Sequence, residues 1–175
     1  MARRGCKVSA RKIDPIVPAW DQLQAAHKAH SRAYDERDEA EAKARKAGFE
    51  PKLPVVCIRG YDCLSVAEAK RRAQGLPKEK AKDAVEAMRA ALADQQRRRR
   101  KAGLAPYDAA IRRTNGEWRA AMRAMADKRA TTTLGVILKL KVVETEVQDG
   151  PTGFGEAILA SAISDLGRIG RREKP

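Results

Sequence analysis

Alanine is the most abundant residue of this 175-residue chain, and large apolar residues are scarce. The sequence contains 32 alanines against 31 leucine, isoleucine, valine and phenylalanine residues taken together. Alanine buries little surface but is the best helix former, because its side chain loses no conformational entropy in a helix. Ala, Glu, Lys, Leu and Arg account for 92 of the 175 residues, a level typical of long helices and coiled coils. We therefore predict an all-α protein, and the composition argues against a compact β protein or a large α/β enzyme.

Charge and large apolar residues are concentrated in different parts of the chain. Lysine and arginine number 37 against 23 aspartates and glutamates, which gives a formal net charge of +14. Residues 1–12 contain five basic side chains and no acidic one, so we predict a disordered basic arm there. Residues 131–169 instead hold 14 of the 31 large apolar residues. We expect a core in this C-terminal region, followed by a disordered tail at 171–175.

Residues 13–130 are predicted to form a long antiparallel helical hairpin of coiled-coil type, with arms at 14–48 and 78–130. Asp14 and Pro15 mark its start, because Asp can cap free amides and Pro suits the first helical turn. The stripe that follows repeats at intervals of three and four residues, which places its members on one helical face. These members are Trp20, Leu23, His27, His30, Tyr34, Arg37, Glu41 and Ala44.

An insertion at 48–77 is expected to interrupt this hairpin. Residues 53–58 are mostly apolar and β-branched, which favours a short strand or an ordered loop. Ser65 and Glu68 form a capping box, in which the two side chains satisfy free backbone amides at a helix start. We therefore predict a short helix that ends near Gln74.

Residues 131–170 are predicted to form a C-terminal pair of amphipathic helices. Thr131 to Thr133 can cap the first, although residues 134–147 fit two patterns. Val136, Leu138, Leu140 and Val142 alternate as in a strand, whereas Val136, Leu140, Val143 and Val147 share a helical face. The length of about 14 residues and the threonine cap favour a helix. The second helix has the clearest apolar stripe of the chain: Phe154, Ile158, Leu159, Ala162, Ile163, Leu166 and Ile169.

Three segments resemble a group of uncharacterised small helical proteins from alphaproteobacteria. Residues 14–34 are similar to that group's opening "DP-I" segment and its acidic, alanine-rich helix. Residues 53–69 are similar in leading from a short hydrophobic stretch into a serine-capped helix. Residues 130–141 and 158–166 are similar to a "TTLAG" helix and a closing "LLxxLxxDL" helix. The resemblance implies a helix at 134–147, and it implies no activity, because the group has none assigned.

Two histidines and two cysteines are the candidate metal ligands. His27 and His30 are three residues apart on one helical face, where they could offer two imidazoles to a metal. Cys57 and Cys63 are separated by five residues, whereas zinc sites use two to four and repeat the pair. We interpret the histidines as half-buried residues beside Trp20 and Tyr34, and the cysteines as buried structural thiols. We expect no cofactor and no metal, and we keep a metal-dependent enzyme as a remote alternative.

The basic residues are the candidate nucleic-acid contacts. Lysine and arginine side chains can neutralise phosphates, and the release of counterions then drives binding that does not read sequence. The candidates are Arg3, Arg4, Lys7, Arg11 and Lys12 of the arm and Arg97, Arg98, Arg99, Arg100 and Lys101 of the central helix. The alternative is a solvated helix end and a soluble tail. No recognisable base-reading motif is present, so any binding would be electrostatic.

These observations predict a non-enzymatic helical scaffold or protein-interaction protein, whose apolar stripes bind a protein partner or a second copy. Sequence-nonspecific nucleic-acid binding is the alternative. No nucleophile, phosphate-cradling or dinucleotide motif is found, which argues against an enzyme. Three cysteines at irregular spacing make no disulfide framework and favour a reducing cytoplasm. No apolar stretch is long enough for a membrane span, and the composition is typical of a bacterial gene.

Overall fold

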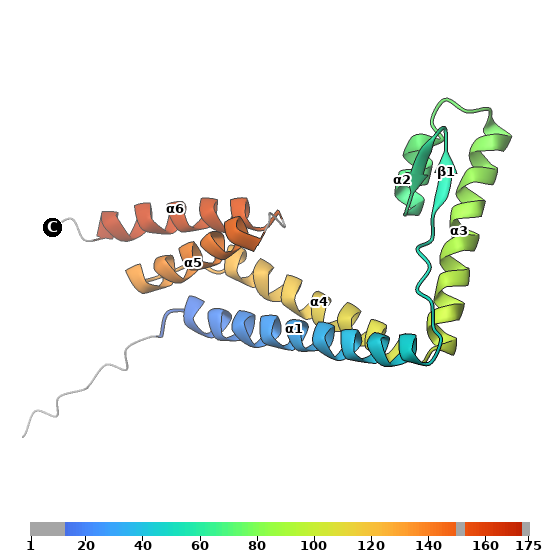
Figure 1. The fold of residues 1–175 in the computed structure, drawn as a ribbon. Helices are drawn as coiled ribbons and strands as arrows, with labels where there is room; N and C mark the ends of the chain where they lie inside the picture. Colours follow the sequence, from blue (N-terminus) through green and yellow to red (C-terminus); the bar gives the residue numbers. More distant parts are fainter. Residues whose placement is uncertain (1–12, 150–152, 173–175) are drawn as a thin grey trace, which may run out of the picture. The chain divides into compact units, whose positions relative to one another are not determined.

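The computed structural model describes residues 13–149 and 153–172. Its elements in chain order are α1 (Ile16–Lys46), β1 (Val56–Ile58), β2 (Tyr61–Cys63), α2 (Val66–Arg72), α3 (Lys78–Lys101), α4 (Ala105–Asp127), α5 (Thr133–Asp149) and α6 (Gly155–Arg172) (Figure 1). Helices dominate and strands are limited to one hairpin within the described ranges, so the all-α prediction is confirmed. The predicted arm at 1–12 lies outside the described residues. The disordered tail predicted at 171–175 is wrong for residues 171 and 172, because α6 continues to Arg172, and the rest of that range lies outside the described residues.

The chain divides into two compact units. Described residues up to Ser31 join those from Arg113 onward, and residues 32–112 form the other unit. The first unit has one core, built from α1, α4, α5 and α6, whose largest members are Ile16, Leu23, Met122, Met125, Val136, Val142 and Ile158. This division differs from the boundary expected at residue 130. The physical reason is that the C-terminal helix pair shares its core with α1 and α4 and has no separate core of its own.

The second unit has a smaller core under the β1–β2 hairpin. Ile58, Cys63, Ala69 and Met88 are buried together there, so α3 packs its apolar face against the hairpin and α2. The predicted hairpin arm at 78–130 consists of two helices, because α3 ends at Lys101 and α4 begins at Ala105.

The extended segment expected at 53–58 is a shorter strand, β1, which pairs with a second strand, β2, that was not predicted. Val56 pairs with Cys63 and Ile58 with Tyr61 in an antiparallel register. Arg59 and Gly60 connect the strands, both with positive φ, at 53° and 81°. A two-residue loop with positive φ at both positions is a type I′ turn, whose twist matches that of the flanking strands. Glycine adopts a positive φ without strain.

The predicted helix starts are confirmed by their hydrogen bonds. The Ser65 hydroxyl accepts from the Glu68 amide at 3.2 Å, and the Glu68 carboxylate accepts from the Leu64 amide at 3.2 Å. At the start of α5, the Thr132 hydroxyl accepts from the Gly135 amide at 3.2 Å. The ambiguous segment at 134–147 is thus helical, as its length and threonine cap favoured. Across the described helices, we find none with the length and hydropathy that a membrane span requires.

Candidate interaction surface

One buried carboxylate sets the position of α5 against the start of α1. Asp14 is only 4% exposed, and its Oδ1 accepts from the Ile16 amide at 2.8 Å. Its Oδ2 accepts from the Thr131 and Thr132 amides at 2.9 and 2.8 Å, and from the Thr132 hydroxyl at 2.7 Å. Burial alone would raise the pKa of the Asp14 carboxyl, but the hydrogen bonds from Ile16, Thr132 and Thr131 together lower it. The carboxylate therefore caps α1 and anchors the segment that leads into α5.

Gly135 allows this close approach between α5 and Asp14. A Cβ atom at residue 135 would lie 2.5 Å from Asp14 Oδ2 and 2.8 Å from its Cγ. Carbon and oxygen atoms cannot pack at that separation, so any side chain here would displace the carboxylate. The glycine is needed for space, since its φ is an ordinary helical one.

A buried ion pair then joins α5 to α6. The Lys139 side chain has no exposed surface, and its Nζ donates to Asp165 Oδ2 at 2.8 Å and to Ser161 Oγ at 2.6 Å. Asp165 also accepts from the Ala130 amide at 2.8 Å and from the guanidinium of Arg168. A buried charge requires this degree of pairing, because desolvation costs several kcal/mol per ion. Lys139 thereby lies in the core, whereas the sequence pattern predicted only apolar residues on the buried face of this helix.

A second polar residue, Glu146, lies on the same buried face of α5. Its Oε2 accepts from the Gly155 amide at 3.2 Å, so it caps the first turn of α6. The buried face of α5 is thus Val136, Lys139, Val142 and Glu146. The predicted face of Val136, Leu140, Val143 and Val147 is wrong in part, since Leu140 and Val147 are exposed. The reason is that Lys139 and Glu146 find partners on α6 and therefore enter the core.

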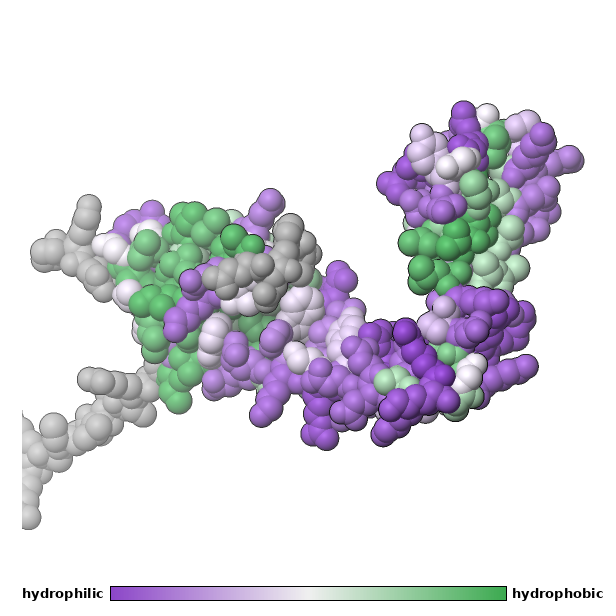
Figure 2. Space-filling model, in the orientation of Figure 1, coloured by the Kyte–Doolittle hydropathy of each residue, from purple (hydrophilic) through white to green (hydrophobic). Residues whose placement is uncertain are grey.

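The apolar stripe of α6 is wider than the core it packs against. Ile158 and Ala162 are buried, but Leu159, Ile163 and Leu166 are 39%, 63% and 53% exposed. These three residues are separated by four and three positions, the spacing of a seam between paired helices. We call them the α6 stripe. On α5, Leu134, Ile137 and Leu140 are also exposed, and Figure 2 shows apolar side chains gathered over these two helices.

Exposed apolar side chains in such a number usually mark a binding surface. A single exposed leucine needs no explanation, whereas a helix with a regular exposed stripe does. The sequence places these three residues on the apolar stripe of the second C-terminal helix, and such stripes were expected to bind a partner or a second copy. Their exposure follows from the width of the stripe, because one helix packed on one neighbour buries only part of an arc that broad.

The basic run at the end of α3 is partly neutralised within its own unit. Arg99 donates twice to Asp108, at 2.7 Å each, and once to Glu41 at 3.3 Å. Arg97 and Arg98 both pair with Asp94, on the preceding turn of α3. Arg99 is therefore a half-buried residue that joins α3 to α1 and α4. Arg97, Arg98, Arg100 and Lys101 are exposed, whereas the predicted sites at Arg3, Arg4, Lys7, Arg11 and Lys12 lie outside the described residues.

The candidate metal ligands belong to different units and form no cluster. His30 is half-buried, as predicted, whereas His27 is exposed, so the prediction is wrong for His27. The His30 ring stacks on Trp118 with centroids 6.1 Å apart, and Tyr34 is exposed.

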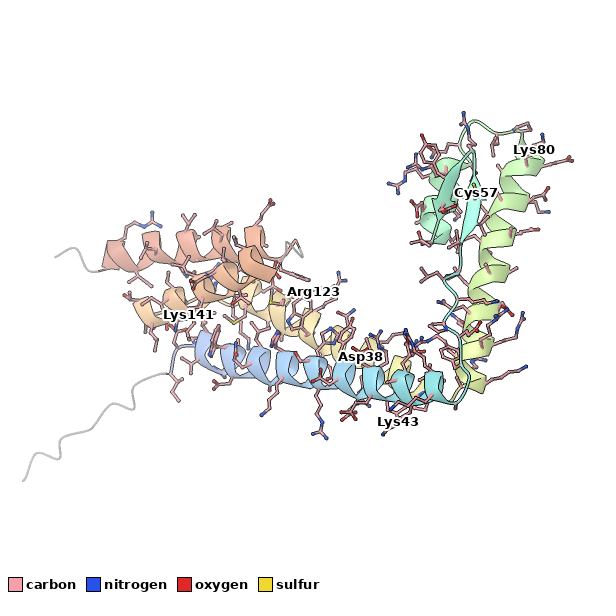
Figure 3. All side chains as sticks on the ribbon, in the orientation of Figure 1. Asp38, Lys43, Cys57, Lys80, Arg123 and Lys141 are labelled. Atoms are coloured by element: carbon pink, nitrogen blue, oxygen red, sulfur yellow. The ribbon has the colours of Figure 1, made fainter. Side chains whose placement is uncertain are left out.

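Cys63 on β2 is buried, as predicted, but Cys57 on β1 is exposed, so the prediction of a buried thiol is wrong for Cys57. Figure 3 labels Cys57 on the hairpin. Because the two cysteines occupy opposite faces of the two-stranded ribbon, they are not placed to form a disulfide. Within the residues that the structure describes, no three His, Cys, Asp or Glu side chains are grouped as a metal would need.

Comparison with known proteins returned no matching family model, no matching curated sequence and no matching solved structure. The resemblance to alphaproteobacterial helical proteins therefore stays a prediction. Any proposal about function depends on the geometry of the residues themselves.

Proposed function

We propose that this protein acts without enzymatic chemistry, as a helical interaction protein that binds a second copy of itself through the α6 stripe. The observation behind the proposal is the exposure of Leu159, Ile163 and Leu166 at seam spacing on a helix whose other apolar half forms the core. Burying such side chains stabilises an assembly by about 25 cal/mol per Å² of apolar surface, before the cost of association.

Charge along α6 favours an antiparallel pair related by a two-fold axis. Glu156 lies in the first turn of the helix and Arg171 near its end. If Leu159 of one copy packs against Leu166 of the other, Glu156 comes close to the partner's last turn, and opposite charges meet at both ends. A two-fold contact buries the same patch on both copies, so it closes at two chains without further growth.

Cysteine cross-linking tests this arrangement. The native Cys6, Cys57 and Cys63 are first replaced by alanine, and Leu159→Cys and Leu166→Cys are then made in separate copies. Mixing the two under mild oxidation should give a mixed disulfide in preference to either self-linked product, because only residues 159 and 166 face one another. Equal yields of all three products would contradict the antiparallel register. No disulfide in any mixture would contradict the interaction itself.

Sequence-nonspecific binding of nucleic acid is a second candidate function, supported by the exposure of Arg97, Arg98, Arg100 and Lys101 at the end of α3. Phosphate contacts are strongest at low salt, so the chain should retard a short duplex at about 50 mM salt and release it as salt rises. Arg100→Gln with Lys101→Gln should weaken retardation, while Lys78→Gln with Lys80→Gln, exposed at the opposite end of the same helix, is the matched control. An unretarded duplex at low salt would contradict this function.

A further inference from the structure

A cavity of about 300 Å³ lies in the first unit, lined by α1, α4 and α5. Its volume is at the lower end of the range found for small-molecule sites. Leu23 and Met122 form part of an apolar lining, and Trp20 and Trp118 contribute indole rings. They are the two tryptophans of the whole chain. No residue of the α6 stripe lines the cavity, so its function is independent of self-association.

The aromatic wall of this cavity is held in place by its neighbours. The His30 ring stacks on Trp118 at an interplanar angle of 10°, and Phe154 meets the same indole edge-on at 84°. The His30 Nδ1 also lies 3.0 Å from the Thr114 hydroxyl, which fixes the orientation of the imidazole. A wall that is ordered before a ligand arrives reduces the entropy lost on binding.

The charge around the cavity is unusual for this chain. Lysine and arginine make up 37 of the 175 residues, yet neither type is found among the residues that line the cavity. Glu146 supplies a carboxylate that is 7% exposed. Burial and the charge of His27 lower the pKa of the His30 imidazole, which disfavours a positive charge on that ring. A basic protein thus contains a cavity whose lining holds a carboxylate, two indole rings and two imidazoles, but no lysine or arginine.

From this combination we propose that the cavity binds a small organic cation, with its charge on an alkylated ammonium group. The face of an indole ring attracts a cation through the ring quadrupole, and this attraction grows when water is excluded. Trp20 and Trp118 both line the cavity, and His30 stacks on one face of Trp118 only. Glu146 supplies the opposite charge, while Leu23 and Met122 suit the alkyl substituents. An anion would meet the Glu146 carboxylate and neither lysine nor arginine, and a bare divalent metal would need several oxygen ligands.

Intrinsic fluorescence tests the proposal directly, because both tryptophans line the cavity. Choline chloride is titrated against the full chain, with sodium chloride at matched ionic strength and 3,3-dimethyl-1-butanol, the neutral carbon analogue of choline, as controls. Choline should change the emission saturably with a Kd of about 1 mM or below, and the neutral analogue should bind about tenfold more weakly. Equal affinity for choline and the neutral analogue would overturn the proposal, and so would a response no greater than that to sodium chloride.

Two variants of α5 separate a role of the carboxylate from a general effect on folding. Glu146→Gln removes the charge but keeps an oxygen that can accept from the Gly155 amide. It should weaken choline binding about tenfold with the helical circular dichroism unchanged. Glu144→Gln removes an exposed charge from the same helix and should leave the Kd unchanged. Equal Kd values for wild type and Glu146→Gln would overturn the assignment of Glu146.

Discussion

Asp14 has a short side chain that accepts hydrogen bonds from two chain segments more than 100 residues apart. Replacing it by Asn keeps the oxygen that caps Ile16 but turns an NH₂ group toward the Thr131 and Thr132 amides, which need an acceptor. Asp14→Asn should therefore lower the free energy of unfolding of the first unit by about 3 kcal/mol. Urea unfolding followed by tryptophan fluorescence measures it, because Trp20 and Trp118 both belong to that unit. A loss under about 0.5 kcal/mol, the range of ordinary surface substitutions, would contradict the role of Asp14 in joining α1 to the segment before α5.

The same carboxylate predicts a pH dependence. The pKa of Asp14 is lower in the folded chain than in the unfolded one, so below about pH 4 the unfolded state binds more protons. The contribution of Asp14 is complete above that pH and is lost as pH falls through its folded pKa. Wild type should thus lose stability more steeply than Asp14→Asn between about pH 4 and pH 2. Parallel curves would contradict the assigned pKa direction.

Arg59 is a non-glycine residue held at a φ of 53° in the β1–β2 turn. An L side chain costs roughly 1–2 kcal/mol in this left-handed region, whereas Asn tolerates it and Asn-Gly favours this turn type. Arg59→Asn should stabilise the hairpin by about 0.5–1 kcal/mol, despite loss of the long Arg59 bond to the Gln74 carbonyl. Amide hydrogen exchange of β1 and β2 measures the effect. Arg59→Lys should give no gain, because the lysine side chain lacks the local hydrogen bonding by which Asn tolerates the left-handed region.

Local residue types predicted the caps well, because a cap bonds to amides within three residues of itself. Asp14, Ser65 and Thr132 were all recognisable in this way. The second role of Asp14, with Thr131 and Thr132, could not be predicted from local chemistry. Its partners are 117 and 118 positions away, and only the packing of α1 against the start of α5 brings them together.

Helices α5 and α6 are held in register by the Lys139–Asp165 pair. Asp165→Asn keeps the shape but leaves the buried ammonium without its counter-charge, which should cost about 3–5 kcal/mol. Lys139→Met should cost less, because Asp165 keeps the Ala130 amide and Arg168 as donors. The double variant should then be more stable than the sum of the single losses indicates, by about 2 kcal/mol. Urea unfolding measures all three, and strictly additive losses would contradict the pairing.

The helical state of residues 134–147 could be predicted from sequence, but the buried face of that helix could not. Hydropathy patterns assign charged residues to solvent, and here Lys139 and Glu146 are buried because α6 supplies Asp165 and the Gly155 amide. The exposed residues follow from the same cause. Once Lys139 and Glu146 face the core, Leu140 and Val147 must face away from it.

At the scale of the whole molecule, the composition predicted the all-α fold class, and the large apolar residues after residue 130 predicted a core there. It did not predict the two units, because each of α1 and α4 contributes residues to both. A periodic stripe shows which face of a helix packs, but it does not say which partner covers that face. The same limit explains why the apolar stripe of α6 could be predicted, but not which of its residues are buried and which are exposed.

Sedimentation equilibrium of the intact chain tests the central claim, that a second copy covers the α6 stripe, most directly. Wild type at micromolar concentration should show a mass twice the 19.3 kDa of one chain. Ile163→Glu places a charge at the centre of the stripe and should give the single-chain mass with helical content unchanged. Ser164→Glu, an exposed neighbour on α6, should leave the wild-type behaviour intact. A single-chain mass for wild type, or equal association by wild type and Ile163→Glu, would contradict the account.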